Sequence, residues 1–182
     1  MAATFTWAET NGAVTPPAGE TTARGECNWK NIDDSTSTYS SYPITVGNRS
    51  YDKFQYGKFT GSWNQITNIK YDHTSGAFGA NLTLYGSKTM AAVGDRVSYR
   101  APQTGTPAAN SVDITTANGS FPSGGKVLYA SATSPDSAGA TSSITGGGTA
   151  YTCYVYTQLT TAAGAAAGDT TQVTMTLQYD EN

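Results

Sequence analysis

The sequence predicts an all-β protein: an antiparallel β-sandwich of jelly-roll or immunoglobulin-like type, with an extended N-terminal arm. Thr, Tyr and Val, which favour strands, are abundant, whereas the helix formers Glu, Leu, Lys and Met are scarce. Apolar and polar side chains alternate along several short segments, so that each has one apolar face. Asn-Gly and Gly-Gly pairs separate these segments. Two layers of such strands can bury each other's apolar faces.

The predicted strands follow one another along most of the chain. The last is the clearest, with Met175 and Leu177 on its apolar face and Thr176 and Gln178 on its polar face. Helical periodicity is nearly absent. We expect strands in the segments 4–9, 42–47, 50–60, 63–71, 80–85, 111–115, 126–130, 150–159 and 171–179.

In two internal segments the alternation predicts towards which face individual side chains point. In the segment 63–71 the alternation places Ile69 and Tyr71 on one face and Ile66 on the other. In the segment 50–60 it separates Gln55 from the apolar face.

The domain organisation is predicted as an arm, residues 1–40, followed by a sandwich body, residues 41–182. The arm contains a Pro-Pro pair and a polar run, and it has too little apolar surface to fold alone. Its aromatic residues Phe5, Trp7 and Trp29 would each cost roughly 2 kcal/mol if left in water. We therefore expect them to pack on the body or on a neighbouring subunit.

Charge and hydropathy argue against several classes of partner. Only 13% of the residues are charged, about half the usual share, and the net charge is −3. The basic residues are scattered, so no groove that follows phosphates is expected and no nucleic acid is predicted as a partner. No apolar run approaches the length of a membrane span, and the start lacks the features of a signal peptide. We expect assembly in a host cytoplasm.

Residues with catalytic or metal-binding chemistry are few. The single histidine, His73, follows Asp72, but neighbours on a strand point to opposite faces, which suits a catalytic pair badly. A small hydrolase with His73 as its base is the weakest of the hypotheses. Cys27 and Cys153 are too few for a zinc site with one histidine, so they are free thiols or one disulfide. No cofactor and no metal are predicted, and Asp33 beside Asp34 is interpreted as a solvated loop rather than a calcium site.

The aromatic residues allow two interpretations. Trp63, Tyr71 and Tyr85 could form an exposed platform for a sugar, which defines a carbohydrate- or receptor-binding hypothesis. They could equally fill the core or contact other subunits, because Tyr and Trp bury a large area at low entropic cost. The second interpretation is favoured.

One stretch is similar to a known class of protein. Residues 42–61 combine Pro-Ile, a Gly-Asn-Arg-Ser turn and an aromatic-rich strand, and residues 63–70 continue with Asn-Gln-Ile-Thr-Asn-Ile. This pattern resembles virion structural proteins of tailed bacteriophages. The resemblance covers about a quarter of the chain and implies no catalytic motif. What it implies is a place in the particle: head decoration, neck or collar, or tail.

These observations together predict a non-enzymatic virion structural protein. We expect a capsid decoration or cement protein that holds the particle through its arm and its sandwich surface, with a neck, collar or tail component as the close alternative. Its expected partners are other virion proteins and further copies of itself, with no membrane and with a glycan as the less favoured partner. The predicted assembly residues are Phe5, Trp7, Trp29, Gln55, Asn64, Gln65 and Asn68, of which the last four are expected to face outwards.

Overall fold

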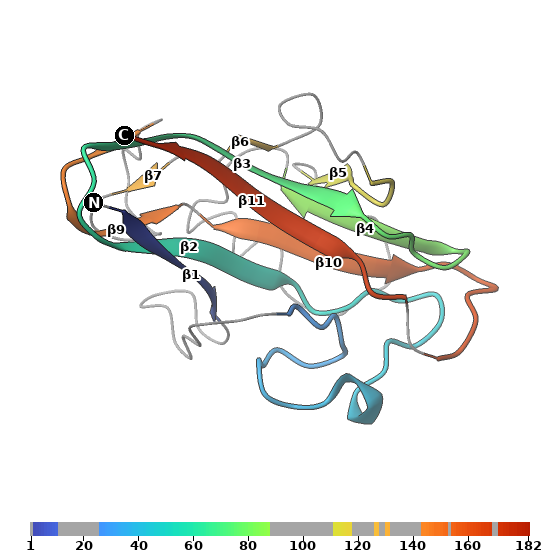
Figure 1. The fold of residues 1–182 in the computed structure, drawn as a ribbon. Helices are drawn as coiled ribbons and strands as arrows, with labels where there is room; N and C mark the ends of the chain where they lie inside the picture. Colours follow the sequence, from blue (N-terminus) through green and yellow to red (C-terminus); the bar gives the residue numbers. More distant parts are fainter. Residues whose placement is uncertain are drawn as a thin grey trace.

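The protein folds into two antiparallel β-sheets (Figure 1), which confirms the predicted all-β, sandwich-like class. The computed structural model describes residues 2–10, 26–87, 111–117, 126–127, 130–131, 143–152, 154–168 and 171–182. The seven-stranded sheet contains β1 (Ala3–Thr10), β2 (Lys53–Gly61), β4 (Leu82–Ser87), β5 (Ser111–Asp113), β7 (Ala130–Ser131), β9 (Gly148–Thr152) and β10 (Val155–Thr161). The four-stranded sheet contains β3 (Gln65–Ser75), β6 (Lys126–Val127), β8 (Ile144–Thr145) and β11 (Thr174–Glu181).

The seven-stranded sheet is organised around β2. One edge of β2 pairs with β1 along eight residues, from Ala3 opposite Gly61 to Thr10 opposite Phe54. The other edge pairs with β10 at the start of β2 and with β9 at its end. A strand in the middle of a sheet has no free edge, and β2 is also buried on both faces. In the first half of β2, Lys53 and Gln55 are therefore as inaccessible as Phe54 and Tyr56.

The main hydrophobic core lies between the two sheets. Phe59 comes from the large sheet, and Ile66, Ile69 and Tyr71 come from β3. On β11, Met175, Leu177 and Tyr179 pack against this core as predicted from the alternation in that segment, and Figure 1 shows β11 running along β3. The fully enclosed members of the core are Phe59, Trp63, Ile66, Ile69, Tyr71, Ile144, Ala150 and Val155.

A β-bulge changes the facing of residues within β3. Thr67 lies opposite Asp180 and Lys70 opposite Gln178, so β3 advances three residues where β11 advances two. The extra residue sits at Asn68, whose φ of 51° is a left-handed conformation that asparagine tolerates better than most residues. Because the bulge inverts the alternation, Ile66 joins Ile69 in the same core. The prediction that they face opposite ways is wrong.

Two smaller clusters complete the interior. Ala8, Phe54, Tyr56 and Tyr154 form one of them, and their exposed fractions do not exceed 4%. The other joins three residues from the end of the sandwich near β4, namely Leu84, Ile114 and Leu159. Trp29 and Phe78 pack against this last cluster, so part of the predicted arm belongs to the interior of the body.

Candidate assembly site

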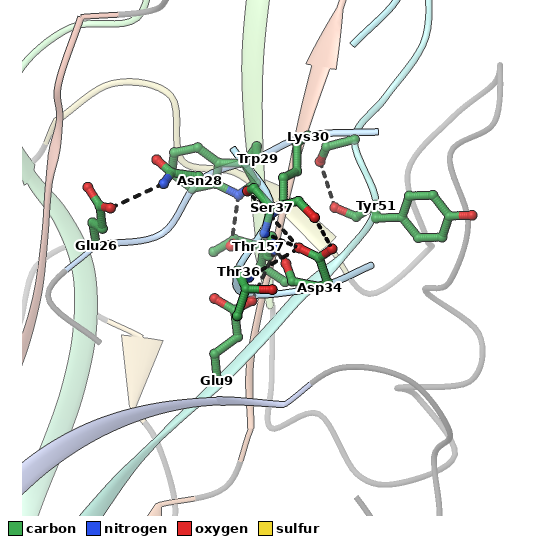
Figure 2. Close-up of polar contacts among 12 residues, drawn as sticks. Glu9, Glu26, Asn28, Trp29, Lys30, Asp34, Thr36, Ser37, Tyr51 and Thr157 are labelled. Carbon is green, nitrogen blue, oxygen red and sulfur yellow. Dashed lines mark hydrogen bonds and ion pairs between the residues drawn. The ribbon is translucent and has the colours of Figure 1, made fainter. Parts of the chain in front are cut away.

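The segment that begins at residue 26 lies against the body at the start of β2. The indole nitrogen of Trp29 donates a hydrogen bond to Thr157 Oγ1 on β10, at 3.1 Å (Figure 2). The ring of Trp29 also meets Phe78 edge-on, with centroids 5.9 Å apart. The backbone nitrogen of Tyr51 donates to the carbonyl oxygen of Lys30 at 3.0 Å. These contacts attach the segment to the sheet on several sides.

Lys30 organises the loop within this segment. Its side chain is 2% exposed, and its Nζ lies 2.6 Å from Asp34 Oδ1. The same Nζ also donates to the carbonyl oxygen of Ser37, whose own backbone nitrogen donates to Asp34 Oδ1 at 2.9 Å (Figure 2). Burial raises the pKa of Asp34, but the hydrogen bonds from Lys30 and Ser37 outweigh it and hold that pKa well below its ordinary value. Asp34 is therefore a structural carboxylate that closes the loop.

A second buried lysine connects this loop to the sheet. Lys53 Nζ on β2 lies 3.0 Å from Glu9 Oε1 on β1, and the two side chains are 2% and 1% exposed. Lys53 Nζ also donates to the carbonyl oxygen of Asp34 at 2.8 Å. One ammonium group thus joins β1, β2 and the loop. A charge this deeply buried needs all of its partners in place, so the three parts are held in one fixed arrangement.

The anchored segment continues into exposed aromatic residues. Tyr39, Tyr42 and Val46 are 43%, 40% and 49% exposed, and they are the exposed large hydrophobic residues of the described part of the chain. Tyr39 begins the short 3-10 helix η1 (Tyr39–Ser41), and Tyr42 follows it. The backbone nitrogen of Asn31 donates to the carbonyl oxygen of Tyr42 at 2.8 Å. We refer to residues 39–46 as the tyrosine segment.

The first and last strands lie side by side at the edge of the sandwich. The backbone nitrogen of Ala3 donates to Glu181 Oε1 at 2.9 Å, and both chain ends lie at the same end of the molecule (Figure 1). The rings of Phe5 and Tyr179 are 5.9 Å apart. Phe5 and Trp7 are only partly buried although they face the core. This edge therefore leaves aromatic surface at the boundary with solvent.

The structure separates the residues predicted for assembly. Trp29 and Gln55 lie near the loop of Lys30, whereas Asn64 and Asn68 are exposed near the C-terminal end of β11. Gln65 is half-buried beside Asn64. Phe5 and Trp7 lie on β1 between these two regions.

The expected outward position of Gln55 is wrong. Gln55 is 2% exposed, because both faces of the first half of β2 are covered and its neighbours on the adjoining strands are Glu9 and Val155. The role of the predicted residues in assembly stays a prediction.

The predicted boundary of the arm stays a prediction as well. Residues 3–10 form a strand of the large sheet, and Trp29 and Lys30 are attached to the body. Residues 11–25 lie outside the described residues. Cys153 is also outside them, and Cys27 is half-buried, so the choice between thiols and a disulfide stays open.

His73 is enclosed in a way that suits packing rather than proton transfer to a substrate. The residue is 0% exposed. Its Nδ1 lies 3.0 Å from the carbonyl oxygen of Ile114, and its Nε2 lies 2.9 Å from that of Ser75. Both ring nitrogens are thus engaged by backbone, and the ring links β3 to the segment after β5.

The aromatic platform proposed for a sugar is not exposed. Trp63 is 6% and Tyr71 is 3% exposed, and Tyr85 is half-buried. Trp7 stacks on Tyr71 with centroids 5.7 Å apart and an interplanar angle of 12°. Burial raises the pKa of Tyr71 well above its ordinary value, with smaller effects from Cys27 and Asp72. Trp63 and Tyr71 therefore belong to the core.

Within the described residues, no group of three or more His, Cys, Asp or Glu side chains is placed to hold a metal ion. No helix in this part of the chain has the length and hydropathy that crossing a membrane requires.

Sequence reasoning did not identify the two buried lysines. Lys30 and Asp34 are four residues apart, but a polar loop contains many such pairs by chance. Lys53 alternates with aromatic residues on β2, which is the pattern of a half-exposed strand. Only the fold shows that this face is covered, through the burial of residues 53–57 and the contact of Lys53 with the carbonyl oxygen of Asp34.

Comparison with known proteins gives no relative for this chain. No protein-family model matches it, and neither a curated protein nor a solved structure is significantly similar.

Proposed function

We propose that the protein is a non-enzymatic structural component of a tailed-phage virion, and that it acts as a capsid decoration protein that docks through the tyrosine segment. The observation that carries the proposal is the exposure of Tyr39, Tyr42 and Val46 on a segment fixed by buried Lys30 and Lys53. The resemblance of residues 42–61 to phage virion proteins includes part of this same segment.

The tyrosine segment suits docking because binding through such a surface costs little conformational entropy. Tyrosine buries a large area and keeps a hydroxyl for a hydrogen bond, which is why it is enriched at interfaces. A segment that is already held in place loses little further entropy when it binds. The ion pair of Lys30 and Asp34 provides that order in the free protein. The surface is therefore suited to a stable contact with a neighbouring protein shell.

Placement at the neck, collar or tail would use the same surface and differs only in the partner. A carbohydrate- or receptor-binding function is the competing class, because Tyr39 and Tyr42 are exposed aromatic residues three positions apart. The experiment below includes an assay for each.

A test uses particles that lack the protein and the purified chain added back to them. The triple variant Tyr39→Ser, Tyr42→Ser and Val46→Ser should bind at least about tenfold more weakly, because truncated interface aromatics commonly cost more than 1.4 kcal/mol in total. Co-sedimentation with the particles measures the bound fraction. The matched control is Ala163→Ser, Ala166→Ser and Ala167→Ser, which changes three exposed residues on another loop and should bind normally.

Equal binding by the two triple variants would remove the tyrosine segment from the proposal. Absence of the native chain from purified particles would remove the virion role itself. A glycan array that binds the native chain and not the tyrosine variant would establish the competing function.

A further inference from the structure

The imidazole ring of His73 lies between two backbone carbonyl groups. Its Nδ1 is 3.0 Å from the carbonyl oxygen of Ile114, in the segment that follows β5. Its Nε2 is 2.9 Å from the carbonyl oxygen of Ser75, at the end of β3. Because the residue is 0% exposed, bulk water cannot take the place of either carbonyl group.

These two partners determine which form of the ring fits the site. A carbonyl oxygen only accepts hydrogen bonds, and a neutral imidazole has one N–H group and one nitrogen lone pair. The neutral ring could therefore donate to Ile114 or to Ser75, and its lone pair would face the other oxygen. An imidazolium has an N–H group on both nitrogens and donates to both carbonyls. Since an unmade hydrogen bond is costly in a buried site, this geometry favours the charged ring.

One carboxylate lies next to this site. Asp72 Oδ1 accepts a hydrogen bond from the backbone nitrogen of His73 at 2.9 Å, and Asp72 is 4% exposed. A buried cation is expensive unless an anion and hydrogen bonds compensate for the lost water. Asp72 and the two carbonyl groups together provide this compensation.

The other elements around His73 contribute little charge. On β11, Met175 lies opposite His73, and residues 171–179 include no charged side chain. The turn that carries Phe78, residues 76–81, contains none either. The remaining titratable groups nearby are an exposed carboxylate that accepts from the backbone of Thr115, a tyrosine whose pKa is raised by burial, a half-buried thiol and a lysine already paired with Asp34, namely Asp113, Tyr71, Cys27 and Lys30.

The hydrogen bond from His73 to Ile114 joins the two sheets. His73 belongs to β3 of the four-stranded sheet, whereas Ile114 donates its backbone N–H to the carbonyl oxygen of Leu84 on β4 at 2.8 Å. Ile114 also packs with Leu84 and Leu159 in one buried cluster. The ring of Phe78 meets the imidazole edge-on, with centroids 5.5 Å apart. His73 therefore connects β3 to β4 at this end of the sandwich.

We propose that His73 is a pH-sensitive link between the two sheets, closed while the ring is an imidazolium and weakened when the ring loses a proton. Below about pH 6.5, the unfolded and the folded chain both hold this proton, and the full stability is present. Above that pH the unfolded chain releases the proton while the folded chain keeps it, so stability falls as pH rises. The inference does not depend on the proposed function.

The direct test observes the ring itself. The chain has one histidine, so a full-length protein without a histidine tag, labelled with ¹⁵N-histidine, contains a single imidazole. NMR spectra are recorded at about pH 7.5, one unit above the midpoint of a free histidine. Two similar ring-nitrogen shifts, each with an attached hydrogen, are expected for the imidazolium. Two widely separated shifts would show a neutral ring and overturn the proposal.

The second test measures stability. The unfolding constant of the native chain, from urea denaturation, should rise by up to about tenfold per pH unit above about pH 6.5. His73→Gln keeps an amide donor but does not titrate, so its unfolding constant should change less with pH. The control Ile114→Val removes one methylene group from the same cluster and should keep the native pH dependence at a lower stability.

Equal pH dependence of the native chain and of His73→Gln would refute the link. If His73→Gln does not fold, the labelled native chain decides by itself, because its spectrum needs no variant.

Discussion

Lys53 is the residue on which the arrangement of β1, β2 and the loop most depends. Its ammonium group is bonded to Glu9 and to the carbonyl oxygen of Asp34, and both charged side chains are enclosed. A buried ion pair adds little net stability over a well-packed apolar pair, but removing one member leaves the other charge in a poor environment. Its value here is geometric, because it fixes where the loop lies on the sheet.

Lys53→Met should destabilise the fold by about 3–5 kcal/mol, because the carboxyl group of Glu9 would stay buried without its lysine partner. Chemical denaturation monitored by circular dichroism measures this loss. The double variant Lys53→Met and Glu9→Gln should lose clearly less than the single variant. Lys58→Met, which changes a half-buried lysine on the same strand, serves as the control and should lose less than about 1 kcal/mol. A double variant no more stable than Lys53→Met would contradict this account of the pair.

The burial of a residue could be predicted correctly where only one face of its strand is covered. Met175 and Leu177 pack on the core as their alternation predicts. Gln55 was misplaced, because a polar side chain on a strand predicts solvent only when that face is open. The strands that flank β2 come from positions far along the chain, so local pattern carries no information about them. The same limitation concealed the buried partners of Lys53.

At the scale of the element, β3 shows where strict alternation along a strand fails to predict which face a side chain is on. The bulge at Asn68 adds one residue to β3, and every side chain before it changes face relative to those after it. The side chain of Asn68 donates to Asp180 Oδ2 at 2.6 Å, across the same irregular pair. The existence of the strand could be predicted from its apolar residues. The bulge could not, because an asparagine within a strand is only a weak indication of left-handed backbone.

Asn68→Val should destabilise the protein by about 1–3 kcal/mol, because a β-branched residue is strained at a φ of 51°. Asn68→Gly should be much milder, since glycine adopts this conformation readily, although it loses the contact with Asp180. Thermal denaturation of the two variants and the native chain provides the comparison. A glycine variant as unstable as the valine variant would show that the hydrogen bond, rather than the backbone conformation, holds the bulge.

At the scale of the whole molecule, the residues of β1 and the segment around Trp29 share one interior with the body. Ala8 and Glu9 on β1 are 0% exposed, and Trp29 packs against the cluster of Leu84 and Leu159. The sandwich class could be predicted from the sequence, because the predicted strands each have an apolar face that must pack against another layer. The packing of Trp29 and β1 on the body could not be predicted in the same way. The predicted arm as a whole is polar and contains prolines, so its composition does not single out the residues that contact the body.

Deletion of residues 1–40 should therefore prevent stable folding rather than leave an intact body. The truncated chain would lose the strand that pairs with β2 along eight residues, and it would expose Phe59 and Tyr71. Circular dichroism and the dispersion of amide signals in NMR spectra measure the result. The native full-length chain is the control. A truncated chain with native strand content and a cooperative transition would show that the body is an independent domain.

The pairing of β3 with β11 has a consequence for biosynthesis. β3 finds its long partner, β11, only at the end of the chain, about a hundred residues after it has been made. A nascent chain therefore carries a half-paired β3 until about a hundred further residues have been made. Pairings between such distant segments close slowly, so β3 and β11 should pair late in folding, and chains that terminate before β11 would be substrates for chaperones and proteases.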